Sequence, residues 1–210
     1  MSLKKLLGQV RIDLKQKEEA KEEIQKSMRQ ATRLSKQAIL LIHQRRLEEA
    51  RRSLKETDGP FSTLTKLTKK YPELFYSGLV SAAFQEYTEA QILFRLVENG
   101  QFIGPEELNV PSIDYVLGLA DVIGELRRRA LDMLRKGNVK TAEECLKTME
   151  EIFSELTAMD DAYMLIPGLR RKCDVARHVI EITRGEITIE ARRASLERSI
   201  RKLEKAITMK

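Results

Sequence analysis

No proline occurs before Pro60, and apolar side chains recur through residues 3–55 at the three- and four-residue spacing of a helix. Within this segment Leu34, Ala38, Leu41 and Ile42 form one apolar stripe, and charged residues fill many of the positions between them. A continuous helix of this length would measure roughly 80 Å at a rise of about 1.5 Å per residue, which exceeds the diameter of one compact domain. The segment must therefore bend or pack its stripe against other chains.

Turn and cap signals divide the rest of the chain into further helices, and no stretch shows the alternation of a β-strand. The Asp58-Gly59-Pro60 turn is predicted to end the first helix, and Asn99-Gly100 and Gly137 are predicted to end later ones. The sequence thus predicts one all-α domain over residues 1–210, built as a seven-helix bundle with a long N-terminal helix. The predicted helices cover residues 3–55, 62–70, 73–98, 113–136, 141–159, 167–184 and 188–209.

Charge is distributed unevenly along the chain. Residues 1–55 carry a net charge of +8 and residues 192–210 carry +5, whereas the residues between them carry −7. Basic surfaces attract polyanions by releasing counterions, and nucleic acid is their usual partner. A solvated helix face, or contact with an acidic neighbouring subunit, is the alternative. The candidate RNA-binding residues of the first helix are Arg29, Arg33, Lys36, Arg45 and Arg46.

Two pairs of carboxylates lie in the two most apolar segments of the chain. Glu86 and Glu89 are three residues apart, and Asp121 and Glu125 are four apart, so each pair shares one side of a helix. Burying like charges is unfavourable unless a positive charge neutralises them, and all-oxygen sites suit Mg²⁺ or Mn²⁺. The four acids are therefore a candidate metal-dependent catalytic site. The alternative is chance spacing, since 33% of the residues are charged.

Other catalytic and metal-binding motifs are missing from the sequence. His43 and His178 lie far from both acidic pairs, which argues against the Glu-x-x-His pattern of di-iron bundles. Cys145 and Cys173 lack metal-ligand spacing and are expected to be reduced thiols, although a bridge between them stays open. No apolar run is long enough for a signal peptide or a membrane span. A soluble, cytoplasmic protein with no membrane partner is expected.

Gly118 and Gly124 flank the helix face that carries Asp121 and Glu125. Each glycine costs about 1 kcal/mol in a helix interior relative to alanine. Close approach by another helix or by a substrate would explain both positions. Two tolerated glycines are the alternative.

Four segments of the chain resemble the translin/Trax family, and the Trax branch most closely. They are SKQAILLIH at 35–43, QEYTEA at 85–90, IDYVLGLADVIGEL at 113–126 and RGEI at 184–187. The resemblance implies an all-α, seven-helix subunit that assembles into a hollow, barrel-like oligomer, for which we expect a homo-octamer. It covers nearly the whole chain.

The resemblance also implies an endoribonuclease that cuts single-stranded RNA with Mg²⁺ or Mn²⁺, because the catalytic acids of Trax fall on Glu86, Glu89, Asp121 and Glu125. We expect Glu89 and Glu125 to bind the metal directly, while the other two acids position metal and water. The chain is shorter than animal Trax but has strongly basic ends, so one chain is expected to bind and cleave RNA. The alternatives are a non-catalytic, translin-like binder of single-stranded RNA or DNA, and a purely structural helical scaffold.

Overall fold

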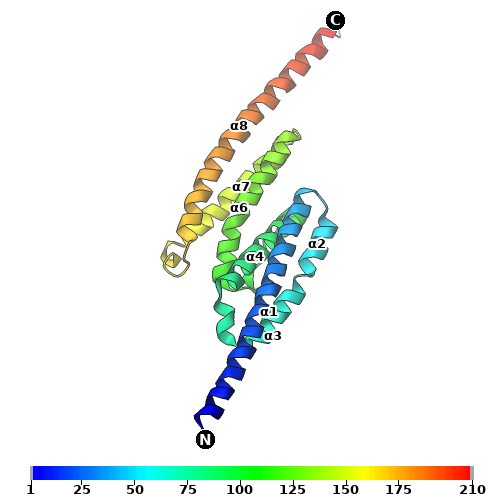
Figure 1. Cartoon of the computed structure of the whole chain (residues 1–210). Coiled ribbons are helices and arrows are strands. Elements are labelled where there is room, and N and C mark those ends of the chain that lie inside the picture. The colour runs from blue at the N-terminus through cyan, green and yellow to red at the C-terminus, as the bar shows by residue number, and fades with distance from the viewer. Residues whose placement is uncertain (1, 209–210) are drawn as a thin grey trace. The chain divides into compact units, whose positions relative to one another are not determined.

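The computed structural model describes residues 2–208, apart from the side chains of residues 160 and 206. All regular structure in this range is helical, which confirms the all-α prediction (Figure 1). The chain divides into two compact units, Met1–Gly118 and Leu119–Lys210, and the boundary between them lies within helix α6 (Ser112–Arg135). The assignment of residues 1–210 to a single domain stays a prediction.

The first unit is organised around the long helix α1 (Leu3–His43), which packs against α2, α3 and α4. The apolar stripe predicted from the sequence is buried in the core of this unit, and Met28 and Ile42 on α1 and Ile92 and Leu93 on α4 are fully buried. Burial of these side chains is the main source of the unit's stability. The other elements are α2 (Leu47–Lys55), α3 (Asp58–Thr68), the 3₁₀ helix η1 (Pro72–Tyr76), α4 (Gly78–Asn99) and α5 (Pro105–Leu108).

The prediction of one continuous helix over residues 3–55 is wrong. Helix α1 ends at His43, and Arg45 takes a left-handed conformation with φ of 63°. The Arg46 amide then donates to the carbonyl of Leu41, 2.9 Å away, so the chain reverses into α2. This reversal buries Ala50 and Leu54, and α2 packs back on α1. The segment therefore bends, because packing its second half on its own first half buries apolar surface that a straight helix would expose.

Helix boundaries elsewhere match the cap signals in part. The Asp58-Gly59-Pro60 sequence begins α3 instead of forming a separate turn. Proline is tolerated there because the backbone amides of a helix's first turn have no hydrogen-bond acceptor within the helix, so no bond is lost. Helix α4 begins after the N-cap Ser77, later than predicted, because residues 72–76 form the 3₁₀ helix η1. Gly100, with φ of 73°, ends α4 as predicted.

The second unit contains the remainder of α6, α7 (Val139–Ala158), the short 3₁₀ helix η2 (Asp160–Ala162) and α8 (Leu169–Thr208). Part of its core is a cluster in which Met133, Ala142, Cys145 and Ile187 pack together. The prediction of two helices separated at Gly185 is wrong, because α8 continues through this residue. Thr183 and Ile187, on either side of the glycine, are both buried, and this packing offsets the low helix propensity of glycine.

Candidate functional site

The first acidic pair lies on α4, within the first unit. Lys36 Nζ, on α1, lies 3.0 Å from Glu86 Oε1. The side chain of Glu86 is 27% exposed and that of Lys36 is 61% exposed, so this ion pair stays in contact with solvent. Glu89 is also half-buried and makes an interaction of its own. The structure thus brings together one predicted catalytic acid and one predicted RNA-binding lysine.

The second acidic pair lies on α6, within the second unit. Lys172, on α8, donates from its ammonium group to both carboxylate oxygens of Asp121. Glu125 Oε2 lies 3.8 Å from a guanidinium nitrogen of Arg128 on the same helix. Asp121 and Lys172 also line a cavity of about 440 Å³ whose other walls include Ala120, Ile123 and Val175. Sequence reasoning missed Lys172, because it lies 51 residues from Asp121 and no local spacing connects them.

The RGEI segment at 184–187 helps to hold α6 against α8. Arg127 donates to Thr183 Oγ1 at 2.6 Å and to both carboxylate oxygens of Glu186 at 2.9 and 3.2 Å. A forked guanidinium–carboxylate contact of this kind restricts the orientation of both side chains. Arg127 is two residues beyond Glu125, so the contact fixes the stretch of α6 that carries the second acidic pair.

The acids fit a divalent metal by donor chemistry but do not gather into a ready-made metal cage. Among residues 2–208, leaving aside the side chains of residues 160 and 206, no three His, Cys, Asp or Glu side chains lie close enough together to hold an ion. Each helix still supplies two carboxylates, and Mg²⁺ commonly uses one or two carboxylates with water and phosphate oxygens completing its shell. Lys36 and Lys172 supply positive charge of the kind that the sequence analysis expected from a metal ion.

A buried polar network fixes α4 against the start of α6 within the first unit. Ser81 donates from its hydroxyl to Asp114, and Gln85 Nε2 lies 3.0 Å from Ser81 Oγ and 3.3 Å from Asp114 Oδ1. Asp114 is 7% exposed and lies in the first turn of α6, where the helix dipole favours a negative charge. Because Gln85 directly precedes Glu86, this network holds the backbone that presents the first acidic pair.

Gly118 is required by the close approach of two helices. A Cβ atom at this position would lie 2.6 Å from the carbonyl oxygen of Gln85 and 2.8 Å from Cβ of Thr88. The predicted close approach is therefore confirmed at Gly118. At Gly124 an added Cβ would meet no atom within 4 Å, so this glycine is tolerated and not required by packing.

The predicted RNA-binding residues of α1 form part of one exposed face. Arg29, Arg33 and Lys36 are all exposed, and their spacing of four and three residues places them along one side of the helix. Arg45 and Arg46 lie in the turn that follows α1. Arg46 is engaged by Glu49, with Nε 2.7 Å from Oε1, and this hydrogen bond holds the pKa of Glu49 below its usual value.

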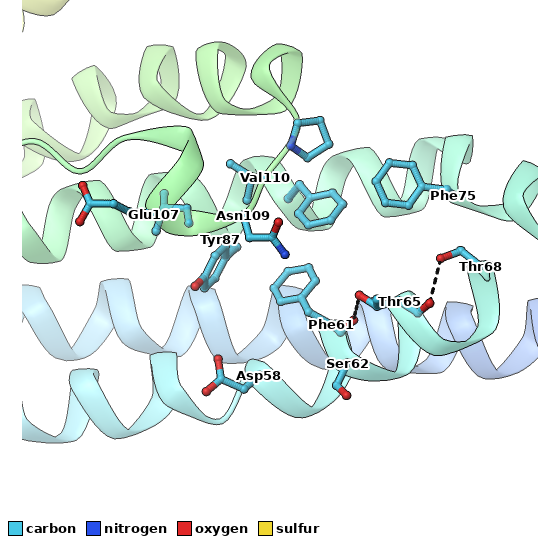
Figure 2. A pocket seen from close by; sticks show the side chains of 13 residues that line it. Asp58, Phe61, Ser62, Thr65, Thr68, Phe75, Tyr87, Glu107, Asn109 and Val110 are labelled. Atoms are coloured by element: carbon cyan, nitrogen blue, oxygen red, sulfur yellow. Dashed lines mark hydrogen bonds between the residues drawn. The ribbon is translucent and has the colours of Figure 1, made fainter.

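The first unit contains an aromatic cavity that the sequence analysis did not predict (Figure 2). Its volume is about 720 Å³, and the Phe61 ring lies 4.9 Å from the ring centroids of both Phe84 and Tyr87. Asp58 and Glu107 also line the cavity, and their carboxylates would repel a phosphate backbone. The cavity is therefore unsuited to the RNA-phosphate contacts expected of α1.

No helix within the part of the chain that the structure describes is long and apolar enough to span a bilayer.

Comparison with known proteins identifies relatives across most of the chain. The model of the Translin family matches residues 19–207. An uncharacterized protein of Methanocaldococcus jannaschii is 32% identical over 193 residues, which are 91% of this chain and 85% of the relative.

Solved structures give the same relationship. The chain is similar to AfC3PO in a complex with duplex RNA, with 35% identity and a TM-score of 0.79, over 88% of this chain and 96% of that chain. It is also similar to apo-NeC3PO, with 25% identity and a TM-score of 0.79 over the same shares of the two chains. The sequence match and the shared fold agree, and the chain belongs to the Translin family.

Proposed function

We propose that this protein binds RNA and cleaves it as a metal-dependent endoribonuclease acting on single strands. The observation that carries RNA binding is the 35% identity to AfC3PO, whose structure is a complex with duplex RNA. Phosphate contacts depend little on base sequence, so a surface that binds a duplex backbone is also chemically suited to a single strand. The carboxylates of α4 and α6 support the catalytic part of the proposal.

The exposed face of α1 is the proposed RNA-binding surface. Arg29, Arg33 and Lys36 would contact successive phosphates, since all three lie on one side of the helix and face solvent. Lys36 is the last of the three and already lies beside Glu86. A phosphate bound by Lys36 would therefore lie next to a carboxylate of the first acidic pair.

Glu86, Glu89, Asp121 and Glu125 are the proposed donors to Mg²⁺ or Mn²⁺. When bound, such an ion would lower the pKa of water and stabilise the charge that develops on a phosphate. Lys36 pairs with one acid of the first pair, and Lys172 pairs with one acid of the second. Since both ammonium groups lie on long, flexible side chains in contact with solvent, each can leave its carboxylate and bind a phosphate oxygen instead.

The test is cleavage of short RNA with and without Mg²⁺ by Glu89→Gln and Asp121→Asn. Both variants should lose cleavage and keep RNA affinity, because an amide cannot replace an anionic donor to a hard cation. Glu98→Gln on α4 and Asp132→Asn on α6 are matched controls, because each removes an acid of the same helix that lies outside the proposed donor set and pairs with an arginine. Full activity in both acid variants would disprove the proposed donors.

The second candidate is a non-catalytic RNA binder. The Lys36–Glu86 and Lys172–Asp121 pairs favour it, because they give these two acids cationic partners from the chain itself. In that case the wild-type protein would bind RNA and leave it intact at every Mg²⁺ concentration. The same cleavage assay therefore separates the two candidates.

We also propose that the protein works as a homo-oligomer, for which an octamer enclosing the RNA is our specific expectation. Large apolar side chains are exposed near the beginning of α1 and along the end of α8. Exposed apolar surface of this extent is typical of an association surface. Light scattering that returned a monomer of about 24 kDa would contradict this proposal.

A further inference from the structure

Two exposed apolar stripes remain at opposite ends of the sequence. The first consists of Leu3, Leu7, Val10 and Leu14 on α1, and the second of Leu196, Ile200, Leu203 and Ile207 on α8. Each of the eight residues is 46–74% exposed in the single chain, so neither stripe is covered within it. We call these the α1 stripe and the α8 stripe.

Both stripes have the spacing of a coiled-coil seam. The intervals between successive residues are four, three and four in each stripe, which is the alternation of a and d positions in a heptad. On α1 the same register continues inward through Ile24, Met28 and Ala31, which are buried in the first unit. The α1 stripe thus shares its register with a buried seam further along the helix, and Lys17 and Lys21 occupy the two seam positions between them.

We propose that the α1 stripe of one copy packs against the α8 stripe of a second copy as a short antiparallel coiled coil. In antiparallel helices an a residue of one helix faces a d residue of the other. The resulting layers are Leu3 with Ile207, Leu7 with Leu203, Val10 with Ile200, and Leu14 with Leu196. Every layer is filled by two apolar side chains, and no charged residue enters the seam across these four layers.

The residues that flank the seam decide the direction of the two helices. In the antiparallel register the e positions face each other, which places Lys4 beside Glu204 and Arg11 beside Glu197. Opposite charges at these positions favour the pairing. In a parallel register the apolar residues would also match, but Lys4 would lie beside Arg192. The charges therefore select the antiparallel direction.

The flanking charges also disfavour antiparallel pairing of either stripe with its own copy. Two α8 stripes would place Glu197 opposite Glu204, and two α1 stripes would place Lys4 opposite Arg11. A parallel pair of α8 stripes avoids that repulsion but leaves the α1 stripe uncovered. The proposed pairing covers both stripes with a single type of contact.

The contact ends where the seam becomes charged. The next layer inward would place Lys17 opposite Arg193, which is unfavourable for association. Each is already paired within its own chain, Lys17 with Glu73 at 2.7 Å and Arg193 with Glu190 at 2.7 Å. The interface is thus limited to residues 3–14 of one copy and 196–207 of the next.

A contact between two different surfaces is heterologous, so each copy offers one stripe to each of two neighbours. Such contacts close into a ring when the rotation between copies permits. The inference rests on the self-association part of the proposed function and is independent of RNA cleavage. It specifies the surfaces through which the copies meet.

Disulfide trapping tests the register directly. The double variant Leu7→Cys/Leu203→Cys should form intermolecular disulfides under mild oxidation and give a ladder of linked chains on a non-reducing gel. Gln9→Cys/Leu203→Cys is the matched control, since Gln9 lies at an outer heptad position and should give little linkage. A disulfide within one chain, or linkage of the single variant Leu203→Cys to itself, would overturn the proposal.

Sedimentation velocity then tests whether the contact holds the assembly together. Leu7→Asp and Leu203→Asp should each weaken association by about tenfold or more, because each places a charge in a buried apolar layer. Arg11→Glu should weaken association, and adding Glu197→Arg should restore it. Intact oligomers in both Asp variants would overturn this interface while leaving self-association standing. A monomeric wild-type protein would overturn both, and circular dichroism on each variant checks that the helices are intact.

Discussion

Lys36 Nζ lies 3.0 Å from Glu86 Oε1, so a residue expected to hold RNA neutralises a residue expected to hold a metal. The pair connects the exposed basic face of α1 with the first acidic pair of α4. Lys172 and Asp121 repeat the arrangement between α8 and α6 in the second unit. In both places a lysine from another helix, on a partly exposed side chain, pairs with the carboxylate.

The Lys36 side chain should contribute one phosphate contact to RNA binding. Lys36→Gln should weaken RNA affinity and reduce the slope of log affinity against log salt by about 0.7, the value for one contact to a single strand. Lys66→Gln on α3 is the control, because Lys66 is exposed but lies outside the α1 face. Binding measured by fluorescence anisotropy over a salt series gives both slopes. An unchanged slope for Lys36→Gln would exclude its phosphate contact.

Removal of an acid should not stabilise the metal-free protein. If Asp121 were unmatched, its removal would relieve repulsion, but the structure pairs it with Lys172. Because both side chains are partly exposed, Asp121→Asn should lower the free energy of unfolding by no more than about 1 kcal/mol. A double-mutant cycle with Lys172→Met, followed by urea denaturation, measures the coupling between the two residues. A rise in stability on Asp121→Asn alone would show that the pair is not stabilising.

The two glycines of α6 should respond in opposite directions to alanine. Gly118→Ala should destabilise the protein by roughly 1–3 kcal/mol, because the new Cβ would overlap a backbone carbonyl that cannot easily move. Gly124→Ala should stabilise it by up to about 1 kcal/mol, since the position is open and alanine favours the helix. Thermal unfolding measures the change in stability of both variants, and each variant serves as the control for the other.

Stability should fall at alkaline pH. Burial raises the pKa of the Cys145 thiol and the pKa values of the Tyr87 and Tyr115 hydroxyls above their ordinary values. Because these folded-state pKa values exceed the unfolded ones, the stability that the neutral groups contribute is complete below about pH 8 and is lost as pH rises through the folded values. Ionisation of Tyr115 would also remove its hydrogen bond to the carbonyl of Ile103.

The measurement is the free energy of unfolding in urea between pH 7 and 11. Cys145→Ala should flatten the early part of the decline, since this thiol has the lowest ordinary pKa of the three groups. A stability that stays constant to pH 11 would show that folding raises the pKa of none of these groups.

The sequence by itself determined the helical content, several helix ends and the acidic pairs on their helices. These features depend on local spacing: the three- and four-residue periodicity, a left-handed glycine at position 100, and charges three or four residues apart. Close approach of another segment at Gly118 was also one of the two explanations that the sequence offered, although the sequence did not identify the segment that approaches. Each of these signals lies within about one turn of the residues that it concerns.

Only the tertiary structure decided where the chain reverses and which charges meet. The reversal at Arg45 depends on the burial of α2 against α1, and the continuity of α8 through Gly185 depends on the packing of its neighbours. The partners of Glu86 and Asp121 come from helices distant in the sequence, and no periodicity encodes such a pairing. Burial and charge pairing are properties of surfaces brought together by folding, so they could be known only once the helices had been packed.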